Sequence, residues 1–309
     1  MLVDRPPALV ADRFWMLGAA AYPLYLYVGE KSATLFEGGI GAMGPLVRDQ
    51  IAATPAAGLP IAQIVVTHAH PDHVMAVPFL RDAFPGAAVL ASEKAAATMA
   101  AEKAIGFFVK IDATLTASLV AQGRLAADLR GTPPADNRIA VDRILAEGDV
   151  VEVDASVGFR VLQTPGHSDC SLSFFEPTRK ILIVSDATGF YMPDQDYLWP
   201  DYFSDYAQYM ASIERLAALG AEALCLSHNA AIVGAADVAD YFRMVLDATR
   251  AYHERIVAEA QAGKSARDIA AALGAEIHGR TPVLPLDFFE KNSALLVKQS
   301  LRHAGIAPA

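Results

Sequence analysis

The first half of the chain alternates between hydrophobic patterns typical of strands and patterns typical of helices. Leu24–Val28 and Ala33–Phe36 are apolar runs separated by a short polar segment, which predicts a β-hairpin. The sequence Glu37-Gly38-Gly39 then interrupts the second run, and the apolar residues of Met43–Thr54 recur with helical spacing. The chain is therefore expected to open with antiparallel strands followed by a helix.

The pattern continues with further strands and a long helical stretch. Ile61–Thr67 is rich in β-branched residues and predicts a buried strand. Ser92 is a suitable N-cap for an alanine-rich helical pattern that extends to about Ala127 and is broken near Gly106. Two shorter elements are also predicted, a helix at Ala76–Phe84 and a strand at Ala88–Ala91.

A second strand-rich block follows the Gly- and Pro-containing loop at residues 131–134. Its predicted strands are Val150–Val153, Phe159–Thr164, Ser171–Phe175, Ile181–Ser185 and Ala223–Ser227. Tyr206–Leu219 has a helical pattern, the chain is helical after Gly234, and Asp287–His303 predicts the last helix. Two strand-rich blocks, each followed by helices, predict an α/β fold, a four-layer αβ/βα sandwich. Residues 1–234 would form it, with a helical insertion at about 92–130, and residues 235–309 would add a C-terminal helical extension.

Composition and charge narrow the classes of partner. Of the 309 residues, 53% are hydrophobic and 19% are charged, which is the opposite of the balance found in disordered chains. The chain carries 25 Lys and Arg against 35 Asp and Glu, a formal net charge of −10. An acidic chain is a poor match for nucleic acid or for an anionic membrane surface. We therefore expect neither as the main partner.

Two features bear on the compartment. Cys170 and Cys225 form no CxxC pair and predict free thiols in a reducing cytoplasm. Phe14–Val28 is apolar for about fifteen residues, short of the roughly twenty that span a bilayer. The charges that precede it cancel, whereas a signal peptide begins with a basic region. We expect this segment to form a strand and the protein to be cytoplasmic.

The strongest chemical signal follows the predicted strand Ile61–Thr67. His68, His70, Asp72 and His73 lie within six consecutive residues. Imidazole nitrogens and carboxylate oxygens are ligands for Zn²⁺, Fe and Mn²⁺. Six consecutive residues cannot all point at one ion, so the run fits two adjacent metals better than one. The alternative is a solvated polar loop that is rich in histidine.

Three further candidate ligands also follow predicted strands. His167 comes after Phe159–Thr164, Asp186 directly follows Ile181–Ser185, and His228 directly follows Ala223–Ser227. A single His or Asp in such a place is usually a hydrogen-bonded, capping or turn residue. The same placement at several strand ends is what favours one metal centre.

Together these residues resemble the ligand series of the metallo-β-lactamase-fold hydrolases in type, order and approximate spacing, over roughly residues 10–235. The resemblance implies that His68, His70 and His167 bind one metal, that Asp72, His73 and His228 bind a second, and that Asp186 bridges both. Residues 1–234 would then be the catalytic domain. Such a dinuclear centre would hold two divalent ions, zinc ahead of iron or manganese. Asp72 and Asp186 would also be catalytic, because they would hold and orient the hydroxide that bridges the metals.

Local features resemble the branch of this superfamily that contains the thioesterase-like response protein of quinolone signalling. They are the FEGGI turn at Phe36–Ile40, the LASE step at Leu90–Glu93 and the GHSD sequence at Gly166–Asp169. The resemblance implies a hydrolase acting on a thioester, ester or lactone carbonyl. Glu37-Gly38-Gly39 lies where the superfamily usually has an Asp-containing turn.

The substrate is expected to be a small acyl or aromatic ester or thioester. A helical lid would cover it with apolar residues, for which the candidates are Gly106–Val109, Tyr191–Tyr202 and Leu286–Phe289. The alternative is that these are ordinary packing residues of the added helices. Two other functions stay open at this point, a regulatory or interaction protein that needs little turnover, and a phosphodiesterase that uses the same metals. The oligomeric state is also open, with a homodimer as one alternative.

Overall fold

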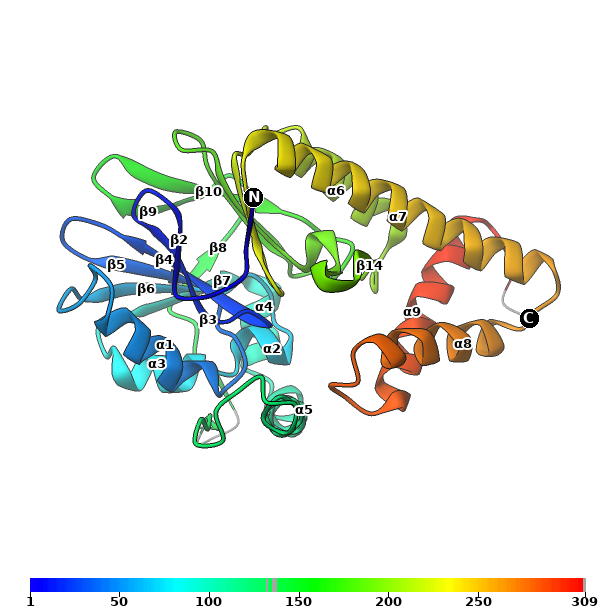
Figure 1. Cartoon of the computed structure of the whole chain (residues 1–309), viewed down its shortest axis with the longest axis horizontal. Coiled ribbons are helices and arrows are strands. Elements are labelled where there is room, and N and C mark those ends of the chain that lie inside the picture. The colour runs from blue at the N-terminus through cyan, green and yellow to red at the C-terminus, as the bar shows by residue number, and fades with distance from the viewer. Residues whose placement is uncertain (132, 135–137, 308–309) are drawn as a thin grey trace. The chain divides into compact units, whose positions relative to one another are not determined.

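The structure is a computed structural model that describes residues 1–131, 133–134 and 138–307. The chain forms two compact units (Figure 1). The sheet unit comprises Met1–Gln163, Cys170–Ser185 and Gly220–Val238. The helical unit comprises Thr164–Asp169, Asp186–Leu219 and Ala239–Ala309.

The first sheet of the sheet unit has seven strands that neighbour one another in chain order. They are β2 (Ala8–Ala11), β3 (Phe14–Ala19), β4 (Tyr22–Val28), β5 (Ala33–Phe36), β6 (Ile61–Val65), β7 (Ala88–Ser92) and β8 (Arg143–Leu145). The pairs from β2 to β5 are antiparallel and those from β5 to β8 are parallel. Parallel neighbours need long crossovers, and helices supply them after β5, β6 and β7. The predicted hairpin is confirmed, and the apolar run Phe14–Val28 forms β3 and β4.

The second sheet also has seven strands. In spatial order they are β1 (Leu2–Val3), β16 (Ala231–Val233), β15 (Ala223–Leu226), β12 (Ile181–Ser185), β11 (Leu172–Glu176), β10 (Val157–Gln163) and β9 (Val150–Asp154). Only the pair of β12 with β15 is parallel among these described strands. The strands predicted in this block are all present, with ends that differ by one or two residues.

The hydrophobic core lies between the two sheets. Phe14 and Phe36 of the first sheet pack against Phe159 of the second, with ring centroids 5.7 and 4.7 Å apart. Phe174 extends this cluster, and all four rings are fully buried. Alternating apolar positions on strands of both sheets therefore meet face to face, as the strand patterns require. The predicted α/β sandwich is confirmed.

The helices of the sheet unit include one that the hydrophobic pattern does not predict. They are α1 (Met43–Ala52), α2 (Pro71–Val74), α3 (Val77–Ala83), α4 (Glu93–Met99) and α5 (Glu102–Ala121). Ser92 caps α4 as predicted, because its hydroxyl accepts a hydrogen bond from the Ala95 backbone N–H at 3.2 Å. The helix α2 has only four residues and lies inside the histidine-rich run.

Two expectations for the long helical stretch are wrong. The break lies at Ala100 and Ala101, between α4 and α5, whereas Gly106 lies inside α5, where an added Cβ would have no other atom within 4 Å. The helical stretch ends at Ala121 and not near Ala127. Gly123 takes φ +68° there, and the Arg124 N–H donates to the Leu119 carbonyl, which is a glycine-terminated helix end. The predicted loop at residues 131–134 is free of regular structure at its described positions, and Thr132 lies outside the described residues.

Among the described residues, α5 is the one helix long and apolar enough to cross a membrane by length and composition. It packs against α2 within the sheet unit. Its Asp112 carboxylate also accepts a hydrogen bond from the Gly41 backbone N–H at 2.6 Å. These contacts attach α5 to the sheet unit through its middle turns.

The helical unit is built from helices and one small hairpin. Its elements are β13 (Phe190–Met192), β14 (Tyr197–Trp199), α6 (Tyr206–Ala217), α7 (Ala235–Gln261) from Ala239 onward, α8 (Ala266–Arg280) and α9 (Leu286–His303). Asp205 caps α6 and Ser265 caps α8 through their side chains. The final helix is confirmed to within one residue, and the segment Tyr191–Tyr202 contains all of the hairpin except its first residue, Phe190.

Candidate metal centre

The histidine-rich run divides into a loop half and a helical half. After β6 ends at Val65, His68 and His70 lie in a loop, and α2 begins at Pro71. His70 is extended at φ −102° and ψ 158°, and Pro71 takes the first helical position, where its missing N–H costs nothing. Asp72 and His73 then lie in the first turn of α2. This change of backbone gives the two halves different directions.

Asp72, His73 and His228 come together within the sheet unit. Asp72 Oδ2 lies 3.5 Å from His73 Nε2 and 3.6 Å from His228 Nε2. One potential ligand atom from each residue lies within 4.8 Å of the other two. Both imidazoles are buried, at 2% and 4% exposure, and Asp72 is partly exposed. Two nitrogens and one carboxylate oxygen in this arrangement are a donor set that suits Zn²⁺, Fe or Mn²⁺.

Both of these imidazoles are oriented through their other nitrogen. His73 Nδ1 donates to Glu37 Oε2 at 3.1 Å, and His228 Nδ1 donates to the Ala21 carbonyl at 2.9 Å. The Tyr22 ring lies edge-on to His228 at 5.2 Å. A proton held on Nδ1 makes Nε2 the lone-pair nitrogen, and in both residues Nε2 is the atom nearest Asp72.

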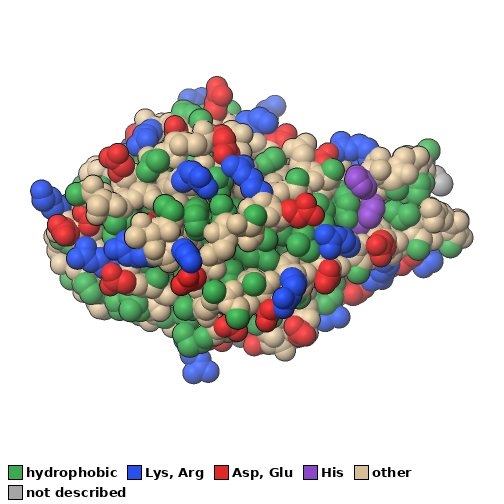
Figure 2. All heavy atoms as spheres, turned by 90° about the horizontal axis from the view of Figure 1, so that it is seen from above, with side chains coloured by type: hydrophobic (Ala, Val, Ile, Leu, Met, Phe, Trp, Pro, Cys, Tyr) green, Lys and Arg blue, Asp and Glu red, His purple; other side chains and the backbone are tan. Residues whose placement is uncertain are grey.

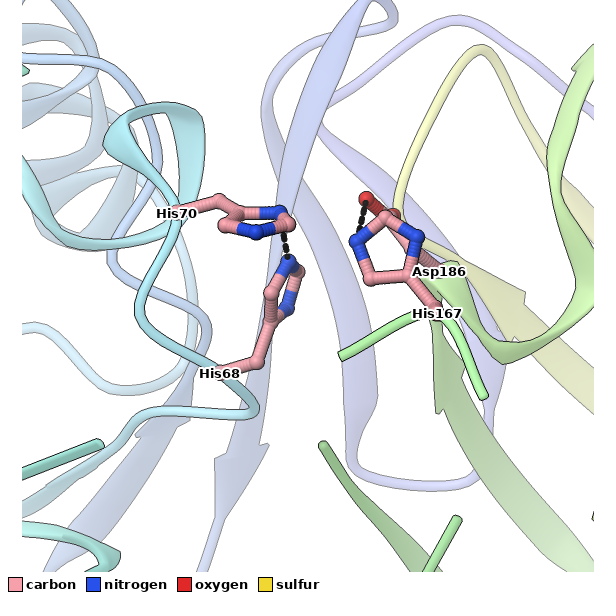
Figure 3. Close-up of side chains that lie close together, drawn as sticks. All are labelled: His68, His70, His167 and Asp186. Carbon is pink, nitrogen blue, oxygen red and sulfur yellow. Dashed lines mark hydrogen bonds and ion pairs between the residues drawn. The ribbon is translucent and has the colours of Figure 1, made fainter. Parts of the chain in front are cut away.

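His68 and His70 form a second pair in the sheet unit. His68 Nε2 lies 3.0 Å from His70 Nδ1, and the ring centroids are 4.5 Å apart (Figure 3). His68 is fully buried. Two nitrogens at this separation suit adjacent corners of a tetrahedral zinc site with bonds of about 2.0 to 2.1 Å.

Hydrogen bonds in one direction link His68 to Glu37. His68 Nδ1 lies 2.9 Å from Ser185 Oγ, the Ser185 hydroxyl donates to Thr67 Oγ1 at 2.9 Å, and Thr67 donates to Glu37 Oε1 at 2.8 Å. The Glu37 carboxylate can only accept, so Thr67 donates to Glu37 and Ser185 donates to Thr67. The Ser185 oxygen is then left to accept from His68, so His68 Nδ1 carries the proton. Glu37 therefore orients His68 as well as His73.

Glu37 lies outside the predicted ligand set, although the resemblance marked its turn, and no sequence pattern indicated its contacts with the histidines. It is 1% exposed and takes φ +75°, a left-handed conformation that is uncommon outside glycine. Gly38 follows, where a Cβ would lie 2.5 Å from the His73 carbonyl oxygen, so the turn packs directly on the backbone of α2. The Met75 and Ala76 N–H groups donate to carbonyls of the same turn. A carboxylate placed directly after a buried strand was the available signal.

His167 and Asp186 form a pair within the helical unit. His167 Nε2 lies 3.4 Å from Asp186 Oδ2 (Figure 3), and both residues are buried. His167 Nδ1 donates to the Asp201 carbonyl at 2.9 Å. Asp186 directly follows β12 and opens a short 3-10 helix, Asp186–Thr188.

A buried carboxyl outside the predicted set lies on α5. The pKa of Asp112 is raised to about 6, chiefly by burial, and the negative charge of Asp72 acts in the same direction, while the hydrogen bond from Gly41 opposes both effects. The apolar character of α5 hid this residue from sequence reasoning, because its neighbours in the chain are almost all hydrophobic or small.

The two cysteines are free thiols, as predicted. Burial raises the pKa of Cys225 well above its ordinary value, so this thiol is unreactive at neutral pH. Cys170 Sγ accepts a hydrogen bond from the Ala69 backbone N–H at 3.4 Å, within the loop that carries His68 and His70.

The chain is similar to several known proteins. It is 27% identical over 170 residues to the uncharacterized protein YobT of Bacillus subtilis (strain 168), a match that covers 54% of this chain and 63% of that protein. A metallo-beta-lactamase family protein of Thermus thermophilus has a similar structure, with a TM-score of 0.64 and 22% identity over 96% of this chain and 95% of that one. The sec-alkylsulfatase Pisa1 of a Pseudomonas species matches 97% of this chain and 50% of its own length, with a TM-score of 0.63 and 15% identity.

These solved structures share the fold of the chain. The family model of the Metallo-beta-lactamase superfamily matches residues 21–228, which include the histidine-rich run and end at His228. The superfamily match and the sandwich of two sheets with His and Asp side chains at their strand ends agree with each other. The chain therefore belongs to the metallo-beta-lactamase superfamily.

Proposed function

We propose that this protein is a dinuclear metal-dependent hydrolase that cleaves a thioester, ester or lactone carbonyl. The observation that carries the proposal is the meeting of Asp72 Oδ2 with His73 Nε2 and His228 Nε2 at 3.5 and 3.6 Å. Each imidazole there is already fixed in the tautomer that a metal requires. Membership of the metallo-beta-lactamase superfamily supports the same interpretation.

The proposed ligands follow the series that the superfamily resemblance implies. Asp72, His73 and His228 would hold one ion, while His68 and His70 with His167 would hold the other, and Asp186 would bridge them. The close pairs His68–His70 and His167–Asp186 support this assignment. Zinc is the proposed metal ahead of iron or manganese, because imidazole-rich sites with few carboxylates suit it well.

Divalent ions at such a centre supply a hydroxide nucleophile from water at neutral pH and polarise the substrate carbonyl. Asp72 and Asp186 would orient that nucleophile as well as hold the ions. Glu37 would hold His68 and His73 in position through the hydrogen bonds described above. No serine or cysteine nucleophile is needed, which agrees with the unreactive state of Cys225.

A small acyl or aromatic substrate is proposed in preference to a nucleic acid. The net charge of −10 disfavours a polyanion, and acidic and basic side chains are interspersed on the face shown in Figure 2. The resemblance to the quinolone-signal response branch supports a thioester within this class.

The test combines metal analysis with a substrate panel. We expect about two zinc ions for each chain, and hydrolysis of acyl-CoA thioesters, aryl esters or acyl-homoserine lactones. Asp186→Asn should lose at least about a hundredfold in kcat/KM, because a ligand and an orienting group are removed together. Asp194→Asn, an exposed change in the same segment, is the matched control and should keep wild-type rates.

Two results would contradict the proposal. A chain that takes up no metal, or an Asp186→Asn variant as active as wild type, would exclude the dinuclear hydrolase. Turnover of bis(p-nitrophenyl) phosphate with no turnover of any carboxylic ester would instead assign a phosphodiesterase. A metal-loaded chain that hydrolyses nothing in the panel would favour the interaction protein.

A further inference from the structure

A backbone carbonyl orients His167 in the helical unit. The Asp201 carbonyl accepts both the His167 Nδ1–H at 2.9 Å and the Phe203 backbone N–H at 2.8 Å. The direction of the His167 ring therefore depends on where this carbonyl lies. Asp201 belongs to a segment without regular structure, residues 201–205, which we call the 201–205 loop.

The 201–205 loop contacts the His167 turn at several points. The Ser204 and Asp205 N–H groups donate to the Gly166 carbonyl at 2.9 and 3.1 Å. The Phe203 ring packs on the His167 ring, with centroids 5.2 Å apart. The loop and the histidine turn thus form one local structure, and a shift of the loop would shift His167.

The other side of this loop is held by the last turns of α9. Gln299 Nε2 donates to the Phe203 carbonyl at 2.9 Å, and Ser300 Oγ lies within 2.9 Å of the Tyr202 hydroxyl. Arg302 contacts the Ser204 carbonyl at 3.4 Å and pairs with the Asp205 carboxylate. Side chains at three positions of α9 therefore bind four consecutive residues of the loop.

The burial of these α9 side chains is informative. Gln299 is 5% exposed and Ser300 is fully buried. Polar side chains on the buried face of a helix cost stability unless they form hydrogen bonds. If these positions only had to pack, a leucine or an alanine would be sufficient. Here their partners are the carbonyl and the hydroxyl of the loop. The polar residues on this face of α9 thus form hydrogen bonds that hold the 201–205 loop.

We propose that α9 is a positioning element for the metal ligand His167, acting through Gln299, Ser300 and Arg302 on the 201–205 loop. The inference rests on the proposed function, because it takes His167 to be a ligand. The C-terminal extension would then do more than cover a substrate. It would set the affinity of the metal ion that His167 binds, while the ion held by Asp72, His73 and His228 would be unaffected.

The test measures zinc affinity by competition with a chromophoric chelator, on the full-length chain. The variant is Gln299→Met with Ser300→Ala, which removes both hydrogen bonds to the loop at nearly constant volume. We expect one of two zinc-binding steps to weaken by about tenfold, the lower end of the effect seen when a partner of a ligand is lost. Cobalt(II) in place of zinc should show an altered visible spectrum for one site.

The matched control is Ser293→Ala, another change from serine to alanine at a fully buried position of α9. The Ser293 hydroxyl has no hydrogen-bond partner within the described residues, so its loss should leave both zinc steps unchanged. Arg302→Gln lies at a half-exposed position and should fold, and it should weaken the same single step to a smaller extent.

Several outcomes would overturn the inference. Wild-type affinity at both steps in the double variant and in Arg302→Gln would show that α9 does not position the ligand. Equal weakening in Ser293→Ala would show a general response of the helix. If the wild-type chain binds two zinc ions and the variants bind them equally well, only this inference fails and the proposed function stands. If the wild-type chain binds no zinc, the inference and the proposed function both fail.

Discussion

Four of the five proposed histidine ligands are oriented by an oxygen acceptor on Nδ1. The acceptors are a carboxylate for His73, the Ser185 hydroxyl for His68, and main-chain carbonyls for His167 and His228. Sequence reasoning found all five histidines, because they cluster at strand ends. It could not find their acceptors, since Glu37 lies 36 residues from His73 and Ala21 lies 207 residues from His228. Main-chain carbonyls also carry no residue-type signal.

The central position of Glu37 leads to a prediction for zinc binding. In Glu37→Gln one carboxylate oxygen is replaced by an amide NH₂ group, which donates and does not accept. The variant therefore loses an acceptor for either His73 Nδ1 or Thr67, and the hydrogen bonds that link Glu37 to His68 are disrupted. We expect both zinc-binding steps to weaken by about 10- to 100-fold. Chelator competition measures this directly. Glu176→Gln is the matched control, because Glu176 is also a buried carboxylate and accepts from the Thr178 and Arg179 N–H groups. Unchanged affinity in Glu37→Gln would contradict the assigned role.

Asp112 gives a prediction for pH dependence. Its pKa is raised from 3.8 to about 6 in the folded chain, so ionisation is unfavourable there. The contribution of the protonated Asp112 to the free energy of unfolding is fully present below pH 3.8. It is lost as the pH rises through about 6. Asp112→Asn should therefore raise the free energy of unfolding at pH 7, by up to about 3 kcal/mol, and have little effect at about pH 3.5.

Urea unfolding of the chelator-treated chain at the two pH values measures this difference. Metal is removed first so that pH-dependent metal binding does not contribute to the measured stability. The exposed change Asp82→Asn is the control. An Asp112→Asn variant that is less stable than wild type at pH 7 would show that the carboxylate at Gly41 stabilises the fold when ionised.

At the scale of elements, strands and longer helices were predictable from their hydrophobic patterns, and the one-turn helix α2 was not. The strands β5, β6 and β12 and the helices α1, α6 and α9 all follow from their hydrophobic patterns. The helix α2 did not, because four residues give no periodicity and its start depends on Pro71 following an extended His70. Gly106 predicted a helix break because glycine disfavours helices, whereas α5 continues through this residue, at a position where a Cβ would have space.

Two glycines near the ends of α5 predict opposite responses to alanine. A Cβ added at either Gly106 or Gly123 would have no other atom within 4 Å, so sterics do not separate them. Gly106 is helical, and Gly106→Ala should stabilise the chain by roughly 0.5 to 1 kcal/mol. Gly123 has φ +68°, and Gly123→Ala should destabilise it by about 1 kcal/mol. Thermal unfolding midpoints of the two variants measure this. Shifts of the same sign would show that the backbone conformation of Gly123 is not what ends the helix.

At the scale of the whole molecule, the sequence predicted the sandwich and the edge strand β9, but not the edge strand β1. β1 has two residues, and Leu2 pairs with Ile232 of β16. Such a strand exists only because a distant strand presents hydrogen-bonding groups, so no local pattern marks it. The substrate lid and the boundary between residues 234 and 235 stay predictions. The helical unit includes the turn with His167, and no periodicity could connect that turn to α9.

Metal binding predicts a stability change of the whole chain. Zinc at 100 times its dissociation constant should add about 2.7 kcal/mol per site, because it binds only the folded state. We expect the thermal midpoint to rise by roughly 5 °C or more with zinc and to fall after treatment with a chelator. Asp72→Asn should lose a large part of this rise, and Asp194→Asn should keep it. A midpoint that zinc does not change would contradict metal binding by the folded chain.

The distance along the chain between Asp72 and His228 has a consequence for biosynthesis. His228 lies just after β15 and before β16, and β16 pairs with β1 near the N-terminus. During translation the ribosome releases the histidine-rich run long before His228, so the three-residue group of Asp72, His73 and His228 cannot close until nearly all of the sheet unit has emerged. The complete binding site for this ion therefore becomes available late. Metal binding at the proposed site would therefore follow synthesis of the first sheet, as a step of maturation.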